Sequence, residues 1–176
     1  MQRIILIGFM GVGKTTLGKK VANKLNIPFI DSDHEIEAHY QKSIGQIFAD
    51  QGESYFRKIE EEYIYALDLR DDFVLATGGG MPCFGKNMDL LNEIGTTFYL
   101  ERSPKELTHR LVNAKTKRPL IVGMEEDELL SFVDHKLKER EEYYRKSNVI
   151  LSRDEQTPEQ IIQFTEHLQL NPLQKS

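Results

Sequence analysis

Five short apolar runs recur along the chain, and longer segments with helical periodicity separate them. The runs are RIILI, PFID, FVLAT, TTFYL and NVIL, at residues 3–7, 28–31, 73–77, 96–100 and 148–151. Between them apolar residues recur every three or four positions, as at Leu17, Val21 and Leu25, which is typical of amphipathic helices. Strands that alternate with helices form parallel sheets covered on both faces. The pattern predicts one domain over residues 1–176, a three-layer α/β/α fold with a five-stranded parallel sheet.

Two helix starts and one irregular segment add detail to this prediction. Ser103-Pro104 and Thr157-Pro158 each pair an N-cap residue with proline at the first helical position. The segment NAKTKRPLIVGMEEDE, residues 113–128, has no convincing period and is long for a structureless connection in a compact domain. We interpret this segment either as disordered or as a lid.

The stretch GFMGVGKTT, residues 8–16, lies between the first predicted strand and the first predicted helix. It matches the phosphate-loop pattern G-x-x-x-x-G-K-[ST] at Gly8, Gly13, Lys14 and Thr15. In such a loop, backbone N–H groups and the helix dipole bind phosphates, the lysine adds positive charge, and the hydroxyl group binds Mg²⁺. A glycine-rich helix cap would require neither the lysine nor the hydroxyl group. The loop therefore predicts a site for a nucleoside triphosphate.

Two acidic residues, Asp31 and Asp33, follow the second predicted strand in the sequence DSD. Ligands bind outside the carboxyl ends of strands in open α/β sheets, so we expect both acids to face the same crevice as the phosphate loop. One acid can hold Mg²⁺ through water, and the other can accept a proton from a substrate hydroxyl group. The alternative is an N-cap aspartate for the next helix, which would account for only one of the two.

Three glycines, Gly78, Gly79 and Gly80, follow the third predicted strand in the sequence TGGG. A tight turn from strand to helix needs one or two glycines. A third allows a ligand to approach the main-chain N–H groups closely. We therefore interpret this turn as a contact to the ligand.

Three arginines are placed where they could bind an anion. Arg57 lies one turn from Glu60 at the apolar stripe of a predicted helix over residues 53–69, and Arg140 continues the apolar face of a later helix. An arginine braced by a glutamate on the inward side suits an anionic ligand, although solvated pairs and snorkelling surface arginines give the same spacing. Arg118, in the irregular segment, could neutralise charge on a transferring phosphoryl group.

Composition limits the partners and the compartment. The chain has 23 Lys and Arg against 28 Asp and Glu, and this net charge of −5 disfavours nucleic acid as a partner. The single cysteine, Cys83, excludes an internal disulfide, and we interpret it as a buried apolar residue.

The five histidines show no metal-ligand spacing, so we expect them at the surface. We expect a cytoplasmic protein, because no segment has the apolar length of a membrane span and predicted structure begins too near Met1 for a signal peptide.

Together these residues describe a kinase for a small hydroxylated carboxylic acid. The chain closely resembles the shikimate kinase family, of the nucleoside-monophosphate-kinase-like group. The matching stretches follow in order over residues 3 to about 150 and read GFMGVGKTTLG, DSD, FR, TGGG, RPLI and the arginine of REEYY. The irregular segment at residues 113–128 has RPLI where a second leucine is usual in the family. We do not assign Arg110 a role in stacking on adenine.

The resemblance implies a P-loop NTPase fold with a shikimate-binding helical region at about residues 32–60 and a lid at about 112–124. It implies ATP-dependent phosphorylation of shikimate to shikimate 3-phosphate, on the pathway to chorismate and aromatic amino acids. The residues it implies for ATP are Gly11, Val12, Gly13, Lys14, Thr15, Thr16 and Arg118. Mg²⁺ would be held by Thr15 and, through water, by Asp31. The residues implied for shikimate are Asp33, Arg57, Gly79 and Arg140, and those implied for catalysis are Asp33, Lys14 and Arg118.

Two alternatives stay open from the sequence. A gluconate kinase would share the phosphate loop and the fold, but TGGG and DSD fit it less well. A shikimate-kinase-like binding protein without catalysis would keep the fold, but the intact Lys14, Thr15 and Asp33 argue against it. We expect shikimate and ATP as partners, no binding to nucleic acid or membrane, and a monomer.

Overall fold

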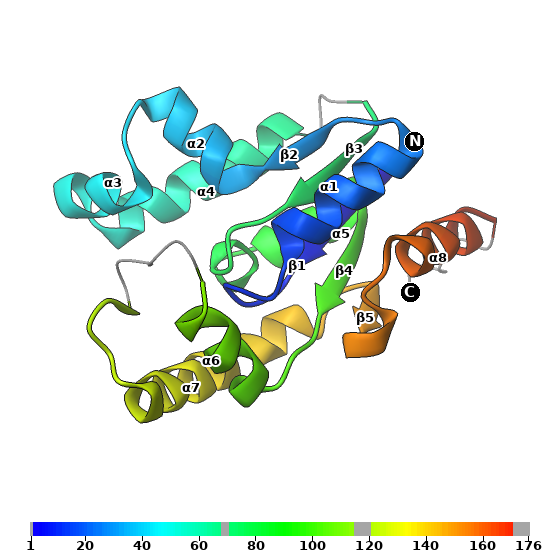
Figure 1. The fold of residues 1–176 in the computed structure, drawn as a ribbon. Coiled ribbons are helices and arrows are strands. Elements are labelled where there is room, and N and C mark those ends of the chain that lie inside the picture. Colours follow the sequence, from blue (N-terminus) through cyan, green and yellow to red (C-terminus); the bar gives the residue numbers. More distant parts are fainter. Residues whose placement is uncertain (1, 68–70, 115–120, 171–176) are drawn as a thin grey trace.

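The computed structural model describes residues 2–67, 71–114 and 121–170 (Figure 1). Within these ranges five parallel strands form one sheet in the order β2-β3-β1-β4-β5. The strands are β1 (Arg3–Ile7), β2 (Phe29–Asp31), β3 (Phe73–Ala76), β4 (Thr96–Leu100) and β5 (Val149–Leu151). The sheet predicted from the apolar runs is confirmed, and each strand end differs from its prediction by at most one residue.

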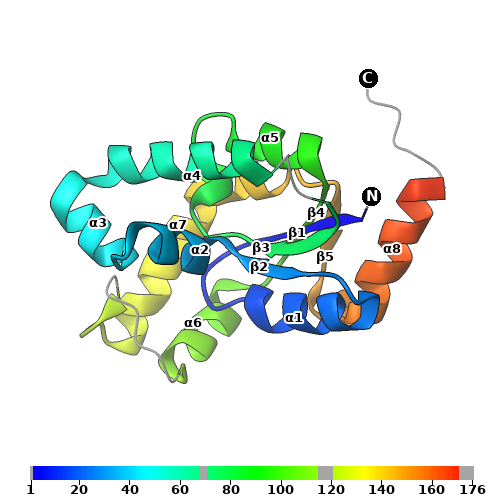
Figure 2. The same cartoon turned by 90° about the horizontal axis from the view of Figure 1, so that it is seen from above.

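Helices cover both faces of this sheet. Figure 2 shows α1 (Lys14–Leu25) and α8 (Pro158–Leu170) on one face, and α4 (Glu53–Leu67) and α5 (Asn87–Ile94) on the other. The other described helices and 3₁₀ turns are α2 (Ser32–Tyr40), α3 (Ile44–Gln51), η1 (Met81–Cys83), α6 (Pro104–Val112), α7 (Glu126–Tyr144) and η3 (Arg153–Glu155). The predicted three-layer architecture is therefore confirmed.

The central strand β1 is fully buried from Ile4 to Ile7. Ile4, Ile5, Leu6 and Ile7 have no exposed surface. Because β1 pairs with β3 on one side and β4 on the other, and helices cover both faces, the side chains of these four residues all lie in the core. A continuous apolar run is what such a strand requires. The core therefore fixes the carboxyl end of β1, where the phosphate loop begins.

The predicted helix starts are also confirmed. Ser103 and Glu106 form a capping box at the start of α6, in which each side chain bonds to the backbone of the other residue. Oγ1 of Thr157 accepts a hydrogen bond from the N–H of Gln160 at 3.3 Å, at the start of α8. None of the helices described has the length and apolar character needed to cross a membrane.

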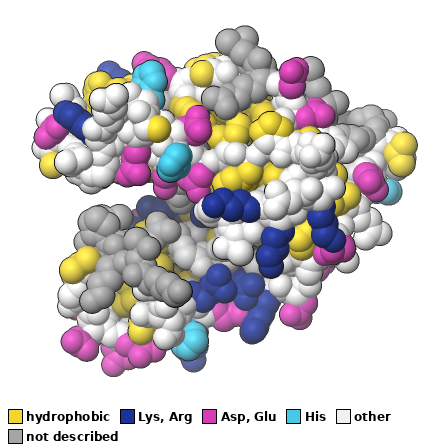
Figure 3. All heavy atoms as spheres, turned by 45° about the horizontal axis from the view of Figure 1, so that its top comes forward, with side chains coloured by type: hydrophobic (Ala, Val, Ile, Leu, Met, Phe, Trp, Pro, Cys, Tyr) yellow, Lys and Arg dark blue, Asp and Glu magenta, His cyan; other side chains and the backbone are white. Residues whose placement is uncertain are grey.

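Two helical lobes extend beyond the carboxyl edge of the sheet. One contains α2, α3 and the start of α4, and the other contains α6 and the start of α7 (Figure 1). Figure 3 shows a deep hollow between these lobes, with Lys and Arg side chains gathered around its inner end. This is the edge at which ligands bind in open α/β sheets.

Candidate active site

The phosphate loop connects β1 to α1 at the carboxyl edge of the sheet. Gly8, Gly11 and Gly13 have φ angles of 137°, 79° and 115°, which glycine adopts without strain. Lys14, the first residue of α1, is only 8% exposed. Its Nζ donates hydrogen bonds to the carbonyl oxygens of Gly8 at 2.7 Å and Phe9 at 3.0 Å. The ammonium group therefore folds back over the loop that is predicted to bind phosphates.

The two expected metal ligands, Thr15 and Asp31, are in direct contact. Oγ1 of Thr15 donates a hydrogen bond to Oδ2 of Asp31 at 2.8 Å. Asp31 directly precedes α2, but its side chain makes no capping hydrogen bond, and Asp33 lies within the first turn of that helix. Asp31 therefore occupies the N-cap position that the alternative gives to one of the two aspartates, but its carboxylate bonds to Thr15 and not to the helix.

The glycine turn after β3 lies between Asp33 of α2 and Arg57 of α4. The N–H of Gly78 donates to Oγ of the buried Ser32 at 2.8 Å, which ties the turn to the start of α2. A Cβ atom on Gly78 would collide with Oδ1 of Asp33. A Cβ atom on Gly80 would lie 2.9 Å from Nη1 of Arg57. Side chains at these positions would displace the two charged groups, so the close approach requires glycine.

Gly79 lies where the phosphate loop approaches Arg140. A Cβ atom on Gly79 would lie 3.2 Å from the backbone nitrogen of Met10 and 3.6 Å from Nη1 of Arg140. The guanidinium group of Arg140 is 5.5 Å from the ring centroid of Phe9, so it points into the crevice and does not snorkel to the surface. Within the described part of the chain, no group accepts a hydrogen bond from the N–H of Gly79 or of Gly80. Both donors can therefore bind a ligand.

Contacts on several sides fix the guanidinium group of Arg57. Its Nη1 donates to Oε2 of Glu60 at 2.6 Å, while Nη2 and Nε donate to Oε1 of Glu53 at 2.8 and 3.2 Å. The ring centroid of Phe84 lies 3.8 Å from its Cζ, which is a stacking contact. These bonds leave one N–H on each Nη atom, and Gly80 faces both atoms. Two such donors can meet a carboxylate.

Glu60 is almost completely buried, with 1% of the residue exposed. Burial raises the pKa of its carboxyl group to about 7, and the charge and hydrogen bond of Arg57 oppose this rise. The charges of Asp33 and Arg140 also affect the pKa of Glu60, so the four groups lie within electrostatic reach of one another. The Arg57 side chain is 15% exposed. The predicted inward pair is therefore confirmed, and the solvated-surface alternative is wrong.

A cavity of about 310 Å³ opens beside the phosphate loop, on the side of β4 and β5. The residues in its wall include Val12, Thr16, Arg110, Gln156 and Pro158. Arg110 is held against the loop because its Nε donates to the carbonyl oxygen of Gly11 at 2.7 Å. Sequence reasoning left Arg110 unassigned and gave Pro158 only the role of a helix start. Thr157-Pro158 correctly predicted the start of α8, but nothing in this dipeptide indicates that it borders a cavity.

The other predicted residues fall into two groups. Cys83 is buried and forms no disulfide, and burial raises the pKa of its thiol to about 11, so its interpretation as an apolar residue is confirmed. The five histidines are all exposed, as expected. Arg118 and residues 115–120 of the predicted lid lie outside the described residues.

The fold and the site together define a class of protein. A phosphate loop between a central parallel strand and a helix binds a nucleoside triphosphate. The carboxylate and arginines across the crevice suit transfer of a phosphoryl group to a small hydroxylated acid. The chain is a small-molecule kinase of the P-loop class. Known proteins identify its family, because the family model for shikimate kinase matches residues 10–169, and the chain belongs to the shikimate kinase family.

Individual relatives agree with this assignment. The shikimate kinase of Bacteroides fragilis is 46% identical over 154 residues, which are 88% of this chain and 86% of the relative. The crystal structure of shikimate kinase from Bacteroides thetaiotaomicron has a TM-score of 0.85 and 40% identity, over 96% of this chain and 97% of that one. Shikimate kinase from Acinetobacter baumannii in complex with shikimate has a TM-score of 0.81 and 31% identity, over 99% and 96% of the two chains. Membership of this family excludes the gluconate kinase alternative.

Proposed function

We propose that this chain transfers the γ-phosphoryl group of ATP to a hydroxyl group of shikimate, giving shikimate 3-phosphate and ADP on the pathway to chorismate and aromatic amino acids. The glycine turn at residues 78–80 carries the proposal, because Asp33, Arg57 and Arg140 meet there beside the phosphate loop. One carboxylate and two guanidinium groups around a small crevice suit a substrate that has both a hydroxyl group and a carboxylate.

The phosphate loop and the cavity beside it would bind ATP. The backbone N–H groups of Gly11 to Thr16 would surround the phosphates, and Lys14 would exchange its two carbonyl acceptors for phosphate oxygens. Charged acceptors bind an ammonium group more strongly than carbonyl groups do, which favours this exchange. The adenine ring would enter the cavity between Arg110 and Pro158, because a planar guanidinium group stacks on aromatic rings.

Thr15 and Asp31 would hold Mg²⁺ next to these phosphates, Thr15 directly and Asp31 through water. Their oxygen atoms are the donors that Mg²⁺ prefers, and they already lie side by side. Mg²⁺ is commonly bound by one or two carboxylates together with substrate phosphates rather than by an all-protein cage. Accordingly, the described residues include no group of three or more His, Cys, Asp or Glu side chains that could hold a metal ion. When bound, the ion neutralises charge on the phosphoryl oxygens.

Arg57 and Arg140 would bind the carboxylate of shikimate, and the N–H of Gly79 would add a further donor. Support comes from the fixed guanidinium group of Arg57, held by Glu53 and Glu60 with one N–H left on each Nη atom. An arginine pre-oriented in this way loses little conformational entropy when it binds a carboxylate.

Asp33 would accept the proton of the attacking hydroxyl group. It lies in the first turn of α2, just after β2, and its carboxylate lies so near the glycine turn that a Cβ atom on Gly78 would collide with it. A positioned general base typically contributes about 10²–10⁴-fold to the rate. Arg118, in the lid predicted at about residues 112–124, would neutralise charge on the nucleotide phosphates while the lid excludes water.

We further propose that the protein acts as a cytoplasmic monomer with shikimate and ATP as its partners. The net charge of −5 supports the absence of a nucleic-acid partner. Gel filtration of the purified chain would test the monomer directly, because a dimer would elute at twice the mass.

The decisive experiment combines purified protein with ATP, Mg²⁺ and either shikimate, gluconate or no acceptor. ADP release should depend on shikimate, and mass spectrometry should detect shikimate with one added phosphoryl group. Lys14→Ala is the control for the phosphate loop and should remove this activity. Binding of shikimate without turnover would favour the non-catalytic alternative, and turnover of gluconate alone would contradict the proposal.

A further inference from the structure

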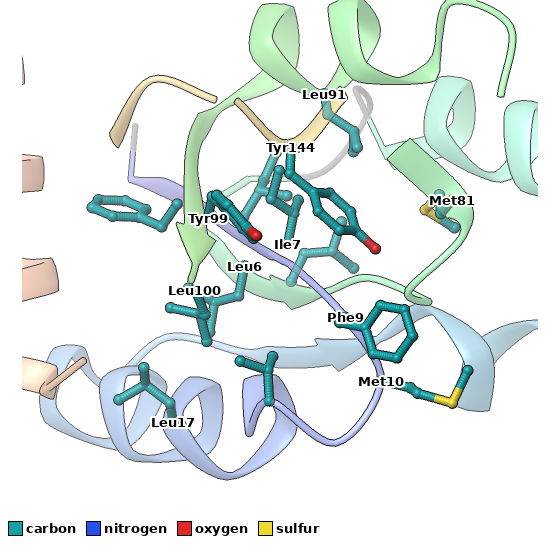
Figure 4. Packing of buried hydrophobic residues seen from close by; sticks show 14 of the residues in the cluster. Leu6, Ile7, Phe9, Met10, Leu17, Met81, Leu91, Tyr99, Leu100 and Tyr144 are labelled. Carbon is teal, nitrogen blue, oxygen red and sulfur yellow. The ribbon is translucent and has the colours of Figure 1, made fainter. Parts of the chain in front are cut away.

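Tyr144, the last residue of α7, connects the hydrophobic core to the glycine turn. It has no exposed surface, and its hydroxyl group donates a hydrogen bond to the carbonyl oxygen of Gly79 at 2.6 Å. Its ring packs against Tyr99 of β4, with the ring centroids 5.0 Å apart. Figure 4 shows the hydroxyl oxygen of Tyr144 directed toward the loop that carries Met81. A buried hydroxyl group costs free energy unless it is hydrogen-bonded, so this bond is part of the packed structure.

The bond to Gly79 also orients the next N–H group of the turn. The peptide unit between Gly79 and Gly80 is planar and trans, and the described residues contain no cis peptide bond. In a trans peptide the carbonyl oxygen and the N–H of the following residue point in opposite directions. Since Tyr144 holds the carbonyl oxygen on the core side, the N–H of Gly80 faces away from the core. Arg57 lies beside Gly80, which therefore borders the crevice.

Arg140, a second residue of the site, lies close to the same hydroxyl group. Arg140 lies four residues before Tyr144 in α7, so the two side chains lie on the same face of the helix. A Cβ atom on Gly79 would lie 3.6 Å from Nη1 of Arg140, so this guanidinium group lies beside the turn that Tyr144 holds. Burial raises the pKa of Tyr144 above its ordinary value, the nearby Cys83 adds to this rise, and the positive charge of Arg140 opposes it. The turn that the hydroxyl group of Tyr144 holds is therefore also the turn beside which Arg140 lies.

We infer that Tyr144 is a positioning residue for the substrate site: its hydroxyl group holds the glycine turn in place beside Arg140, in the arrangement that binds the substrate carboxylate. This inference rests on the proposed function, because it assigns the turn and Arg140 to shikimate. Tyr144 itself has no exposed surface and would not touch the substrate. Its effect is expected on shikimate and not on ATP, because the nucleotide is bound by the phosphate loop and the cavity near β5.

Tyr144→Phe tests the inference, with Tyr99→Phe as the matched control. Both variants remove one hydroxyl group from neighbouring buried rings of the same cluster. We expect Tyr144→Phe to raise the KM for shikimate about tenfold, the effect of losing one hydrogen bond, and to leave the KM for ATP within about twofold. Tyr99→Phe should leave the KM for shikimate within about twofold. Equal changes in the two variants, or equal changes in both KM values for Tyr144→Phe, would overturn the inference.

Nuclear magnetic resonance without substrate tests the positioning separately from the reaction. The amide resonances of Gly79 and Gly80 should shift in Tyr144→Phe and stay near their wild-type positions in Tyr99→Phe. In the wild type, the hydroxyl proton of Tyr144 should exchange slowly with water, a measurement that does not depend on either variant folding. Unchanged glycine resonances or a rapidly exchanging hydroxyl proton would refute the positioning role. A wild-type protein with the expected resonances but no shikimate-dependent turnover would instead refute the proposed function.

Discussion

Replacing Glu60 with glutamine tests how a buried carboxyl group braces Arg57. Burial raises the pKa of Glu60 from 4.5 to about 7, and Arg57 opposes this rise without cancelling it. In the unfolded chain the group titrates near its ordinary pKa. Between these two pKa values the unfolded state loses the proton while the folded state keeps it. The free energy of unfolding therefore falls as the pH rises through this window.

The size of this effect follows from the two pKa values. Each unit of pKa difference corresponds to about 1.4 kcal/mol, so the protonated Glu60 contributes about 3 kcal/mol to the free energy of unfolding, from the difference between 4.5 and about 7. This contribution is present below a pH of about 4.5 and is lost above about 7. Glu60→Gln keeps the shape of the side chain and an acceptor for Arg57, but it does not titrate. Relative to the wild type, the variant should therefore gain about 3 kcal/mol in stability across this window.

Urea unfolding followed by circular dichroism, repeated at closely spaced pH values across this window, measures the effect. The control is Glu53→Gln, which removes the other carboxylate bonded to Arg57 and retains Glu60. Glu53→Gln should therefore keep the wild-type fall in stability. A constant difference between Glu60→Gln and the wild type at every pH would refute the reasoning, because it would mean that Arg57 keeps Glu60 ionised when the protein is folded.

Other changes test separate parts of the proposed site. Asp33→Asn should lower kcat about 10²–10⁴-fold and leave ATP binding intact; near-normal kcat would exclude Asp33 as the base. Arg140→Lys keeps the charge but loses the paired donors, so the KM for shikimate should rise with little change for ATP. Gly80→Ala places a methyl group against Arg57 and should also raise the KM for shikimate; unchanged kinetics would show that the turn has room for a side chain. Hydrogen exchange over residues 113–124 should slow only when an ATP analogue and shikimate are both present, and unchanged exchange would contradict a lid.

The parts of this structure that the sequence predicts are those with a local cause. Each strand of the sheet is a short apolar run, and a strand with both faces covered needs no other information. The phosphate loop is likewise local, because its glycines, lysine and hydroxyl residue lie within eight consecutive positions of the pattern. The inward placement of Arg57 and Glu60 is also local, because it follows from the periodicity of one helix and their ion pair spans one turn of α4.

The contacts that the sequence does not predict join segments far apart in the chain. Tyr144 shares a helix face with Arg140, but its hydrogen-bond partner Gly79 is 65 positions away. Phe84 stacks on Arg57 from the segment after the glycine turn, and nothing in the local pattern around it indicates that contact. Arg110 reaches back to Gly11 across 99 positions. Such pairs depend on how the strands are ordered in the sheet, and many orders are compatible with the same five apolar runs.

That strand order explains why one glycine turn can serve both halves of the proposed reaction. In the order β2-β3-β1, the end of β3 lies between Asp33, which follows β2, and the phosphate loop, which follows β1. A Cβ atom on Gly79 would lie 3.5 Å from the carbonyl oxygen of Gly8, one of the groups that Lys14 contacts. Strands inside a packed core move little, so Asp33 and the phosphate loop stay at a fixed separation. In the proposed reaction, Lys14 would exchange its carbonyl acceptors for phosphate oxygens on one side of the turn, while the substrate would bind on the other side.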